Sequence, residues 1–333
     1  MTETREIHLK TRPVGTPTPD IFEMKTVRLP PPAAGEVQVR NTWMSLDPSM
    51  RGRMYEAKSY VPPFQIGEPL EGRAIGRVIA SNDPALAVGD VVSSTCGWRE
   101  AFNAPADALE KIEPGGLPDE AFLGVAGLTG LTAYVGLVHL AELKPGDVVF
   151  VSAASGAVGS TVCQIAKLLG NRVIGSAGGA AKTEFLLSEL GVDAAIDYKA
   201  EPSLSKALRQ AAPEGIDVYF DNVGGAHLEA ALTCANTFAR FALCGMISTY
   251  NLDAPAPGPK NIMLAVTKNI TLRGYIILNY AHLKDEFQAR MRDWYAAGRI
   301  RKIQTVSEGL DSAVDAFLGL FEGRNLGKTL VRL

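Results

Sequence analysis

Residues 148–159 read Val-Val-Phe-Val-Ser-Ala-Ala-Ser-Gly-Ala-Val-Gly, and this stretch decides the fold of the chain. Its β-branched and aromatic start predicts a strand, and residues 157–169 follow with the apolar spacing of a helix. Between the two, small residues predict a tight turn. The N-terminus of such a helix offers unpaired backbone N–H groups and a partial positive charge to a phosphate.

The turn carries the pattern Ala154-x-Gly156-x-x-Gly159, in which Ala154 stands where the commoner dinucleotide fingerprint has its first glycine. Small residues let a pyrophosphate approach the backbone and let helix and strand pack closely. Glycine-rich turns also arise for packing alone, but this one has the strand–turn–helix context that the fingerprint requires. We therefore expect a dinucleotide site.

The second strand of this unit, predicted over 172–177, indicates which dinucleotide is bound. NAD-selective sites end this strand with an acid that binds the ribose 2′-OH. Here it is followed by Gly178 and Gly179 without an acid, and Lys182 starts the next helix. An ordinary solvated helix residue is the alternative interpretation of Lys182. The missing carboxylate favours the 2′-phosphate of NADP.

The whole chain has the composition of a globular protein of two domains. Its 333 residues exceed one typical domain, and its net charge of −3 gives no basic field for nucleic acid. No apolar run is long enough to span a membrane, and the N-terminus lacks an apolar signal region. We expect a cytoplasmic protein that binds neither nucleic acid nor membrane.

Cysteine and histidine spacing predicts no metal site. No Cys-x-x-Cys and no His-Glu-x-x-His occurs. We expect packing or surface roles for the residues concerned, which are Cys96, Cys163, Cys234, Cys244, His8, His139, His227 and His282.

Two regions differ in their pattern. Residues 1–125 alternate short apolar strands with Pro and Gly, which predicts a partly open barrel. From 145 onward strands and helices alternate, which predicts a doubly wound parallel sheet. The α/β prediction is thus a β-rich GroES-like substrate domain over 1–125 and 290–333, and a Rossmann domain over 126–289. The predicted strands are 36–40, 72–79, 90–93, 148–153, 172–177, 195–198, a strand from Ile216, 240–247, 270–277 and 327–333; the predicted helices are 157–169, 182–190, 203–211, 226–236 and 283–297.

Several short segments together carry a family resemblance over essentially the whole chain. The chain resembles the medium-chain dehydrogenase/reductase superfamily. More narrowly, it resembles the zinc-independent leukotriene B4 dehydrogenase/prostaglandin reductase group, with its plant alkenal double-bond reductases and bacterial curcumin-reductase-like enzymes. The segments are Leu-Asp-Pro-Ser-Met-Arg-Gly-Arg-Met at 46–54, Ser-Tyr-Val-Pro-Pro at 59–63, Gly-Leu-Thr-Ala-Tyr at 130–134, the turn at 153–159, Asp-Tyr-Lys at 197–199, Phe-Asp-Asn-Val-Gly-Gly at 220–225, Cys-Gly-Met-Ile-Ser-Thr-Tyr at 244–250 and Gly-Arg-Asn-Leu-Gly-Lys at 323–328.

This resemblance implies NADP as the cofactor and a homodimer as the assembly. It also implies roles for particular residues, although Tyr198 and Asn222 would otherwise be interpreted as packing at a turn or sheet edge. The implied contacts are Gly156, Ala157, Val158 and Gly159 to the pyrophosphate; Lys182 and Tyr198 to the 2′-phosphate; Asn222 to a ribose; Cys244, Gly245, Met246, Ile247, Ser248, Thr249 and Tyr250 along the cofactor; the backbone of Tyr275, Ile276 and Ile277 beside the nicotinamide; and Asn325 on the nicotinamide side.

The chain departs from the plant enzymes at Ser49, where they carry Tyr. Any substrate contact of that Tyr falls to another group, and Tyr55 and Tyr60 are nearby candidates, although each could simply pack. The zinc-using alcohol dehydrogenases would place a Cys within 45–49 and Gly-His-Glu near 67–72. Neither occurs here, which argues against a catalytic metal.

Without a metal, the substrate must accept hydride readily by itself, as an α,β-unsaturated ketone or aldehyde does at its β-carbon. Charge then develops on the carbonyl oxygen, where hydrogen-bond donors lower the barrier. The nicotinamide ribose 2′-OH, implied by the family, and the Tyr250 hydroxyl are the candidate donors; a Tyr or water would protonate the α-carbon. Two alternatives stay open: an NADPH quinone reductase of the zeta-crystallin type, and a non-catalytic NADPH-binding protein.

Overall fold

The computed structural model describes residues 1–252 and 254–333, which form two compact units. Unit 1 comprises Met1–Leu123 and Gln304–Leu333, and unit 2 comprises Gly124–Ile303. Unit 1 contains β1 (Thr2–Leu9), β2 (Phe22–Leu29), β3 (Glu36–Leu46), β4 (Ala74–Ser81), β5 (Val91–Ser94), β6 (Ala101–Pro105), β7 (Glu110–Lys111), β14 (Gln304–Glu308), α8 (Ala313–Glu322) and β15 (Lys328–Arg332).

Unit 2 alternates strands and helices. Its elements are α1 (Leu128–Tyr134), a π-helix (Val135–Leu140), β8 (Val148–Val151), α2 (Ala157–Leu168), β9 (Arg172–Ala177), α3 (Ala180–Ser188), β10 (Ala194–Asp197), α4 (Leu204–Ala211), β11 (Ile216–Asp221), α5 (Gly225–Cys234), β12 (Ala235–Leu243), α6 (Met263–Thr267), β13 (Thr271–Gly274) and α7 (Lys284–Ala296).

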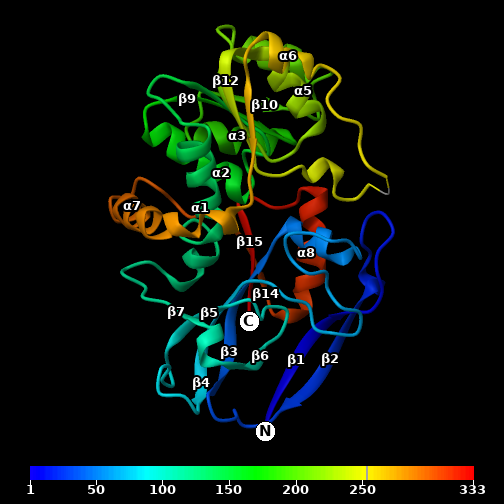
Figure 1. The fold of residues 1–333 in the computed structure, drawn as a ribbon, viewed down its shortest axis with the longest axis vertical. Helices are drawn as coiled ribbons and strands as arrows, with labels where there is room; N and C mark the ends of the chain where they lie inside the picture. Colours follow the sequence, from blue (N-terminus) through cyan, green and yellow to red (C-terminus); the bar gives the residue numbers. More distant parts are fainter. Residues whose placement is uncertain (253) are drawn as a thin grey trace. The chain divides into compact units, whose positions relative to one another are not determined.

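The sheet of unit 2 is six-stranded and parallel, in the order β10-β9-β8-β11-β12-β13 (Figure 1). This is the Rossmann order, in which the chain reverses direction across the sheet between its first and fourth strands, β8 and β11. All four residues of β8 are buried, because helices cover both faces of such a sheet. The predicted doubly wound sheet is confirmed, and its switch point lies between β8 and β11.

The sheet of unit 1 is mostly antiparallel and includes the end of the chain. Its order is β14-β15-β3-β4-β5-β7, and β6 also pairs with β3. The predicted tail strand is confirmed as β15, which pairs antiparallel with β3. The hairpin of β1 and β2 and helix α8 were not predicted, since the sequence analysis found no pattern for them.

Two predicted strands are too long. The strand predicted over 240–247 ends at Leu243, because the N–H groups of Cys244 and Gly245 both donate to the Asp221 carbonyl and turn the chain. The strand predicted over 270–277 ends at Gly274, and a 3₁₀ segment begins at Ile277. The domain boundary predicted at 290 falls inside α7, whereas unit 2 continues to Ile303.

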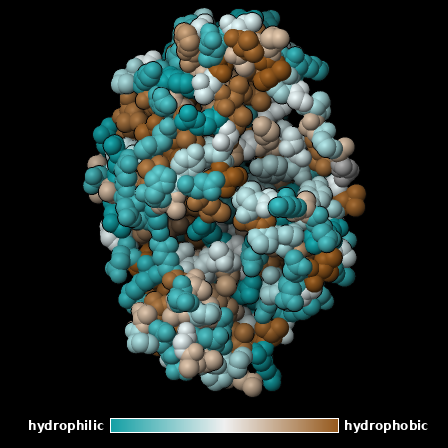
Figure 2. Space-filling view, in the orientation of Figure 1, coloured by the Kyte–Doolittle hydropathy of each residue, from teal (hydrophilic) through white to brown (hydrophobic). Residues whose placement is uncertain are grey.

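The surface of unit 2 includes an apolar area at the top of Figure 2, where Figure 1 places α6. The large apolar side chains exposed in this part of the chain are Phe238, Ile262, Met263 and Val266. Among the described residues, no helix combines the length and apolar character that crossing a membrane requires.

Candidate cofactor and active site

The turn between β8 and α2 is shaped by glycine. A Cβ on Gly159 would lie 2.2 Å from the carbonyl oxygen of Ala153, and one on Gly156 would lie 3.1 Å from the same atom. Ala153 itself has φ of +47°, an uncommon conformation for a residue with a side chain. The turn therefore brings backbone close to backbone. The first N–H groups of α2 are left for a ligand, as at any helix start.

Ala154, in place of the first fingerprint glycine, fits because of a glycine on the neighbouring strand. Its N–H donates to the Ser176 carbonyl at 2.9 Å, which fixes the turn against β9. A Cβ on Gly175 would lie 2.9 Å from the Cβ of Ala154. The small residue that the fingerprint needs at this contact is therefore supplied by β9.

A buried hydrogen-bond cluster holds the switch point together. One carboxylate oxygen of the fully buried Asp221 accepts from the Tyr219 hydroxyl at 2.7 Å and from the N–H groups of Val223 and Gly224. Burial raises the pKa of Asp221, and these hydrogen bonds oppose that rise. The sequence analysis did not single out this cluster; the acid within the Phe-Asp-Asn-Val-Gly-Gly segment was the available signal.

Asn222, predicted to bind a cofactor ribose, is fixed across the switch point. Its side-chain amide donates to the Ser152 carbonyl at 2.8 Å, and its backbone N–H donates to the Ser152 hydroxyl at 2.9 Å. Asn222 is half-buried, so its position at the ends of β8 and β11 agrees with the predicted role.

The predicted cofactor segment Cys244–Tyr250 folds against the same place. The N–H of Ile247 donates to the Asn222 carbonyl at 3.2 Å, and the Ser248 hydroxyl donates to the Val223 carbonyl at 2.6 Å. The Tyr250 hydroxyl lies 3.0 Å from the point that a Cβ on Gly245 would occupy. The structure thus brings Tyr250 and the switch point together within unit 2.

Tyr275 is anchored by its hydroxyl. This group donates to the Thr132 carbonyl at 2.8 Å, and burial raises the pKa of Tyr275 well above its ordinary value. The ring passes so close to the π-helix that a Cβ on Gly136 would lie 2.3 Å from the Tyr275 oxygen. Burial also raises the pKa of the Cys244 thiol to about 12. Neither group is therefore suited to give up a proton near neutral pH.

The predicted 2′-phosphate contacts converge beyond β9. A Cβ on Gly178 would lie 2.9 Å from both the Tyr198 hydroxyl oxygen and Cε of Lys199. Burial, and then the charge of Lys199, lower the pKa of Lys182. Two ammonium groups and a phenol thus border one glycine. The sequence analysis predicted Lys182 and Tyr198 but missed Lys199, although it directly follows Tyr198.

The remaining predicted residues lie in unit 1. The Tyr55 hydroxyl accepts from the Arg51 guanidinium at 2.6 Å, and the guanidinium carbon lies 4.0 Å from the centre of the Tyr55 ring. Tyr60 is 55% exposed. The Asn325 side-chain amide donates to the Gly327 carbonyl at 2.9 Å. The structure describes these three residues within unit 1 only.

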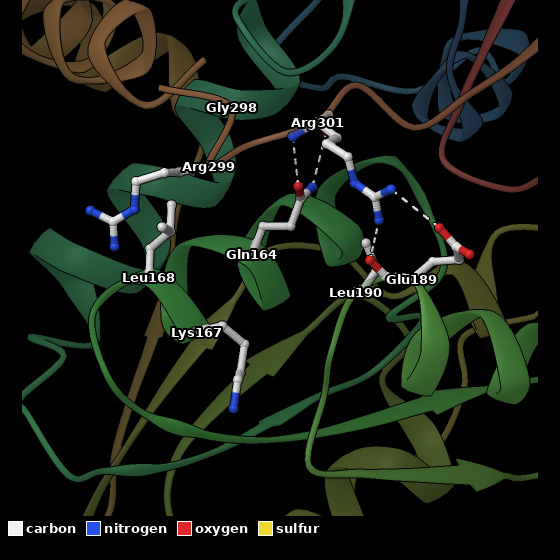
Figure 3. Close-up of a pocket in the computed structure, with 8 residues that line it drawn as sticks. All are labelled: Gln164, Lys167, Leu168, Glu189, Leu190, Gly298, Arg299 and Arg301. Atoms are coloured by element: carbon white, nitrogen blue, oxygen red, sulfur yellow. Dashed lines mark hydrogen bonds and ion pairs between the residues drawn. The ribbon is translucent and has the colours of Figure 1, made fainter. Parts of the chain in front are cut away.

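A cavity of about 250 Å³ in unit 2 lies at the opposite end of α2 from the turn, between that helix, the end of α3 and residues 298–301 (Figure 3). The charged side chains here are already paired: Arg301 contacts Glu189, and Lys167 contacts Asp193 at 2.9 Å. Gln164 accepts from the Arg301 N–H at 2.8 Å and so fixes this segment to α2. These pairings make the cavity part of the scaffold.

Comparisons with known proteins agree with the two units. A family model described as the N-terminal domain of oxidoreductase matches residues 5–112, and one described as zinc-binding dehydrogenase matches residues 157–297. Despite that description, no group of three or more metal-ligating His, Cys, Asp or Glu side chains occurs among residues 1–252 and 254–333.

Similar proteins match along the whole chain. The 2-alkenal reductase (NADP⁺-dependent) of Nicotiana tabacum is 40% identical, covering 98% of this chain and 96% of the relative. The NADPH-dependent curcumin reductase of Escherichia coli is 39% identical, with 98% and 95% covered. Prostaglandin reductase 1 of Bos taurus is 41% identical, with 97% of each chain covered.

The chain belongs to this family of NADP-dependent oxidoreductases. The crystal structure of another such protein, CurA from Vibrio vulnificus in complex with NADPH, has a TM-score of 0.93 and 41% identity, and the match covers 98% of both chains. A quinone oxidoreductase of Escherichia coli, also solved with NADPH, has a TM-score of 0.79 at 23% identity and shares the fold. The predicted family and fold are confirmed.

Proposed function

We propose that this protein is an NADPH-dependent reductase that saturates the carbon–carbon double bond of α,β-unsaturated ketones and aldehydes. The observation that carries the proposal is the match at 39–41% identity, along essentially the whole chain, to reductases named for alkenals, curcumin and prostaglandins. The quinone oxidoreductase match is weaker, and no feature of the described residues favours a quinone.

The chain's own residues fit NADPH. Gly156 and Gly159 form a backbone cradle that a Cβ at Gly159 would fill, as the pyrophosphate-binding role requires. Lys182, Lys199 and Tyr198 supply two positive charges and a hydroxyl for the 2′-phosphate. The ammonium groups of Lys182 and Lys199 repel one another, and a bound anion relieves that repulsion. We add Lys199 to the predicted contacts for this reason.

When bound, NADPH supplies the hydride. The protein's task is then to hold the substrate's β-carbon at the right place and to stabilise charge on its carbonyl oxygen. We assign that stabilisation to the Tyr250 hydroxyl, since Tyr250 follows directly on the segment that packs at the switch point. Tyr275 is excluded as a donor to substrate because its hydroxyl already donates to the Thr132 carbonyl. Tyr55 and Tyr60 stay candidates for substrate contact.

Independence from zinc remains part of the proposal. Residues 45–49 contain no cysteine and residues 67–72 no histidine, so the donor set that the zinc-using branch provides is missing. Activity should therefore survive dialysis against a strong chelator, and elemental analysis should find far less than one zinc per chain. One tightly held zinc lost together with activity would contradict this part.

We also propose a homodimer, and a cytoplasmic location remains the expectation. β13 is the last strand of its sheet, and Phe238, Ile262, Met263 and Val266 expose an apolar area in the same unit. Exposed apolar areas of this kind often mark interfaces. Light scattering should give twice the chain mass. Val266→Asp should shift the protein toward the monomer, while Leu187→Asp on α3 serves as an exposed control.

A panel of substrates tests the proposed function directly. Purified protein should oxidise NADPH, and NADH far more slowly, with an open-chain enone or an enal, and should be slow with a saturated aldehyde. A quinone turned over faster than every enone and enal would favour the alternative. Tight binding of NADPH without turnover of any substrate would favour a non-catalytic binding protein.

A further inference from the structure

His227 lies underneath the group of residues predicted to bind the 2′-phosphate. It belongs to α5, is 5% exposed, and shares a hydrogen bond of 3.0 Å between its Nε2 and the Ser176 hydroxyl. Its ring meets the Tyr198 ring edge-on, with 5.1 Å between ring centres and 76° between planes. On another side it stacks on Phe150 of β8, with ring centres 6.5 Å apart.

These contacts join three separate elements. Ser176 stands near the end of β9, close to where an NAD-selective chain carries its acid, and is fully buried. Tyr198 follows β10 and is 40% exposed, so much of its ring has no protein neighbour. The edge contact with His227 therefore restricts an otherwise exposed ring. Burial lowers the pKa of His227 to about 4, so the imidazole is neutral near pH 7 and adds no charge beneath the two lysines.

We propose that His227 is a positioning residue for cofactor selection: its ring holds the Tyr198 phenol over Gly178, where the hydroxyl can reach a 2′-phosphate. This inference rests on the NADPH assignment proposed above. The hydrogen bond to Ser176 fixes the imidazole in the plane that meets the Tyr198 edge. His227 itself does not reach the cofactor, because its side chain is buried behind Tyr198 and β9.

Two variants separate the ring from the hydrogen bond. His227→Phe keeps a flat ring beside Tyr198 but loses the bond to Ser176. His227→Gln keeps a polar group that can reach Ser176 but loses the ring. A third variant, His227→Leu, also lacks the ring and leaves no polar group of its own buried. An edge-to-face aromatic contact corresponds to about two- to tenfold in an equilibrium constant.

The test is calorimetric binding of adenosine 2′,5′-bisphosphate and of adenosine 5′-monophosphate to the full-length protein. His227→Gln and His227→Leu should weaken the bisphosphate by about two- to tenfold and leave the monophosphate unchanged, whereas His227→Phe should stay close to the parent. In a Tyr198→Phe background, which lacks the hydroxyl, loss of the His227 ring should have no further effect on the ratio of the two constants.

Each outcome is informative. If the ringless variants that fold keep the parent's ratio, or change it equally in the Tyr198→Phe background, the inference is wrong while the NADPH assignment stands. If His227→Phe loses the ratio as fully as the ringless variants, the ring is not the determinant and the inference is also wrong. If the parent itself binds both nucleotides equally, the NADPH assignment fails and the inference falls with it.

Discussion

Unit 2 builds its two cofactor-facing regions from different materials. At the switch point, between the ends of β8, β11 and β12, backbone groups do most of the work: Gly159 packs on Ala153, and the carboxylate of Asp221 gathers N–H groups. Beyond β9, by contrast, side chains border the site, namely Lys182, Tyr198 and Lys199 with His227 beneath them.

The difference separates what each region can select. A backbone cradle recognises the pyrophosphate, which NADH and NADPH share. The region beyond β9 recognises the one phosphate by which they differ. Changes at the switch point should therefore impair both dinucleotides or the chemical step, and changes beyond β9 should impair NADPH alone. The predictions below test this division.

The largest effect is expected from Tyr250→Phe at the switch point, which keeps the ring and removes the hydroxyl. If this hydroxyl stabilises charge on the substrate oxygen, kcat should fall by roughly ten- to a thousandfold, the upper end being typical of one lost oxyanion donor. Cofactor binding should hardly change, which separates catalysis from damage to the fold. An unchanged kcat would remove Tyr250 from the mechanism.

Gly159→Ala tests the backbone cradle. The new Cβ would meet the Ala153 carbonyl oxygen at 2.2 Å, and overpacking of this kind costs about 1–3 kcal/mol, or up to roughly a hundredfold in binding. NADPH and NADH should be weakened by the same factor in titrations of protein fluorescence. Gly258→Ala is the matched control, because a Cβ there meets nothing within 4 Å. A loss confined to NADPH would break the comparison.

The buried His227 predicts a pH dependence of stability. Its folded pKa of about 4 lies below the ordinary value near 6.5, so between these values the unfolded chain binds a proton that the folded chain does not. The free energy of unfolding should thus decrease as pH falls from 6.5 to 4, by up to about 3 kcal/mol. His227→Phe should lose this part of the slope in urea titrations; an identical slope would contradict it.

Lys182→Ala should weaken NADPH and leave NADH nearly unchanged. A charge-assisted contact to phosphate contributes roughly 1.5–3 kcal/mol, or about ten- to a hundredfold in affinity. The measurement is the dissociation constant of each dinucleotide for parent and variant. Equal constants for NADH and NADPH in the parent would contradict the assignment of the cofactor.

Lys199→Ala should act in the same direction but by less, about two- to tenfold, because Lys199 is exposed and its charge is screened by solvent. Lys206→Ala on α4 is a suitable control of the same charge. Raising the salt concentration should shrink the effect of Lys199→Ala. An equal loss of NADH affinity would place Lys199 outside the 2′-phosphate site.

The same division explains how far the sequence could be read. The β8–α2 turn was predicted correctly because its residues are contiguous and their spacing reflects one local geometry. Lys199 and His227 were not, because they approach Gly178 and Tyr198 only once β9, β10 and α5 are packed together.

The ends of β12 and β13 were misplaced for a related reason. The apolar residues after Leu243 and Gly274 continue a strand-like pattern, so composition gave no stop signal. What ends β12 is a distant carbonyl, that of Asp221, which takes the N–H groups of Cys244 and Gly245. Neighbours supplied by another strand leave no mark in the local sequence.

The central claim, reduction of the double bond, is tested most directly by following the label from NADPH deuterated at C4 of the nicotinamide, in both stereochemical forms, into the product of an open-chain enone. NMR of that product should show deuterium on the former β-carbon of a saturated ketone from one of the two forms, with the carbonyl intact. Deuterium on a carbinol carbon of an allylic alcohol would show that hydride goes to the carbonyl, and would contradict the account.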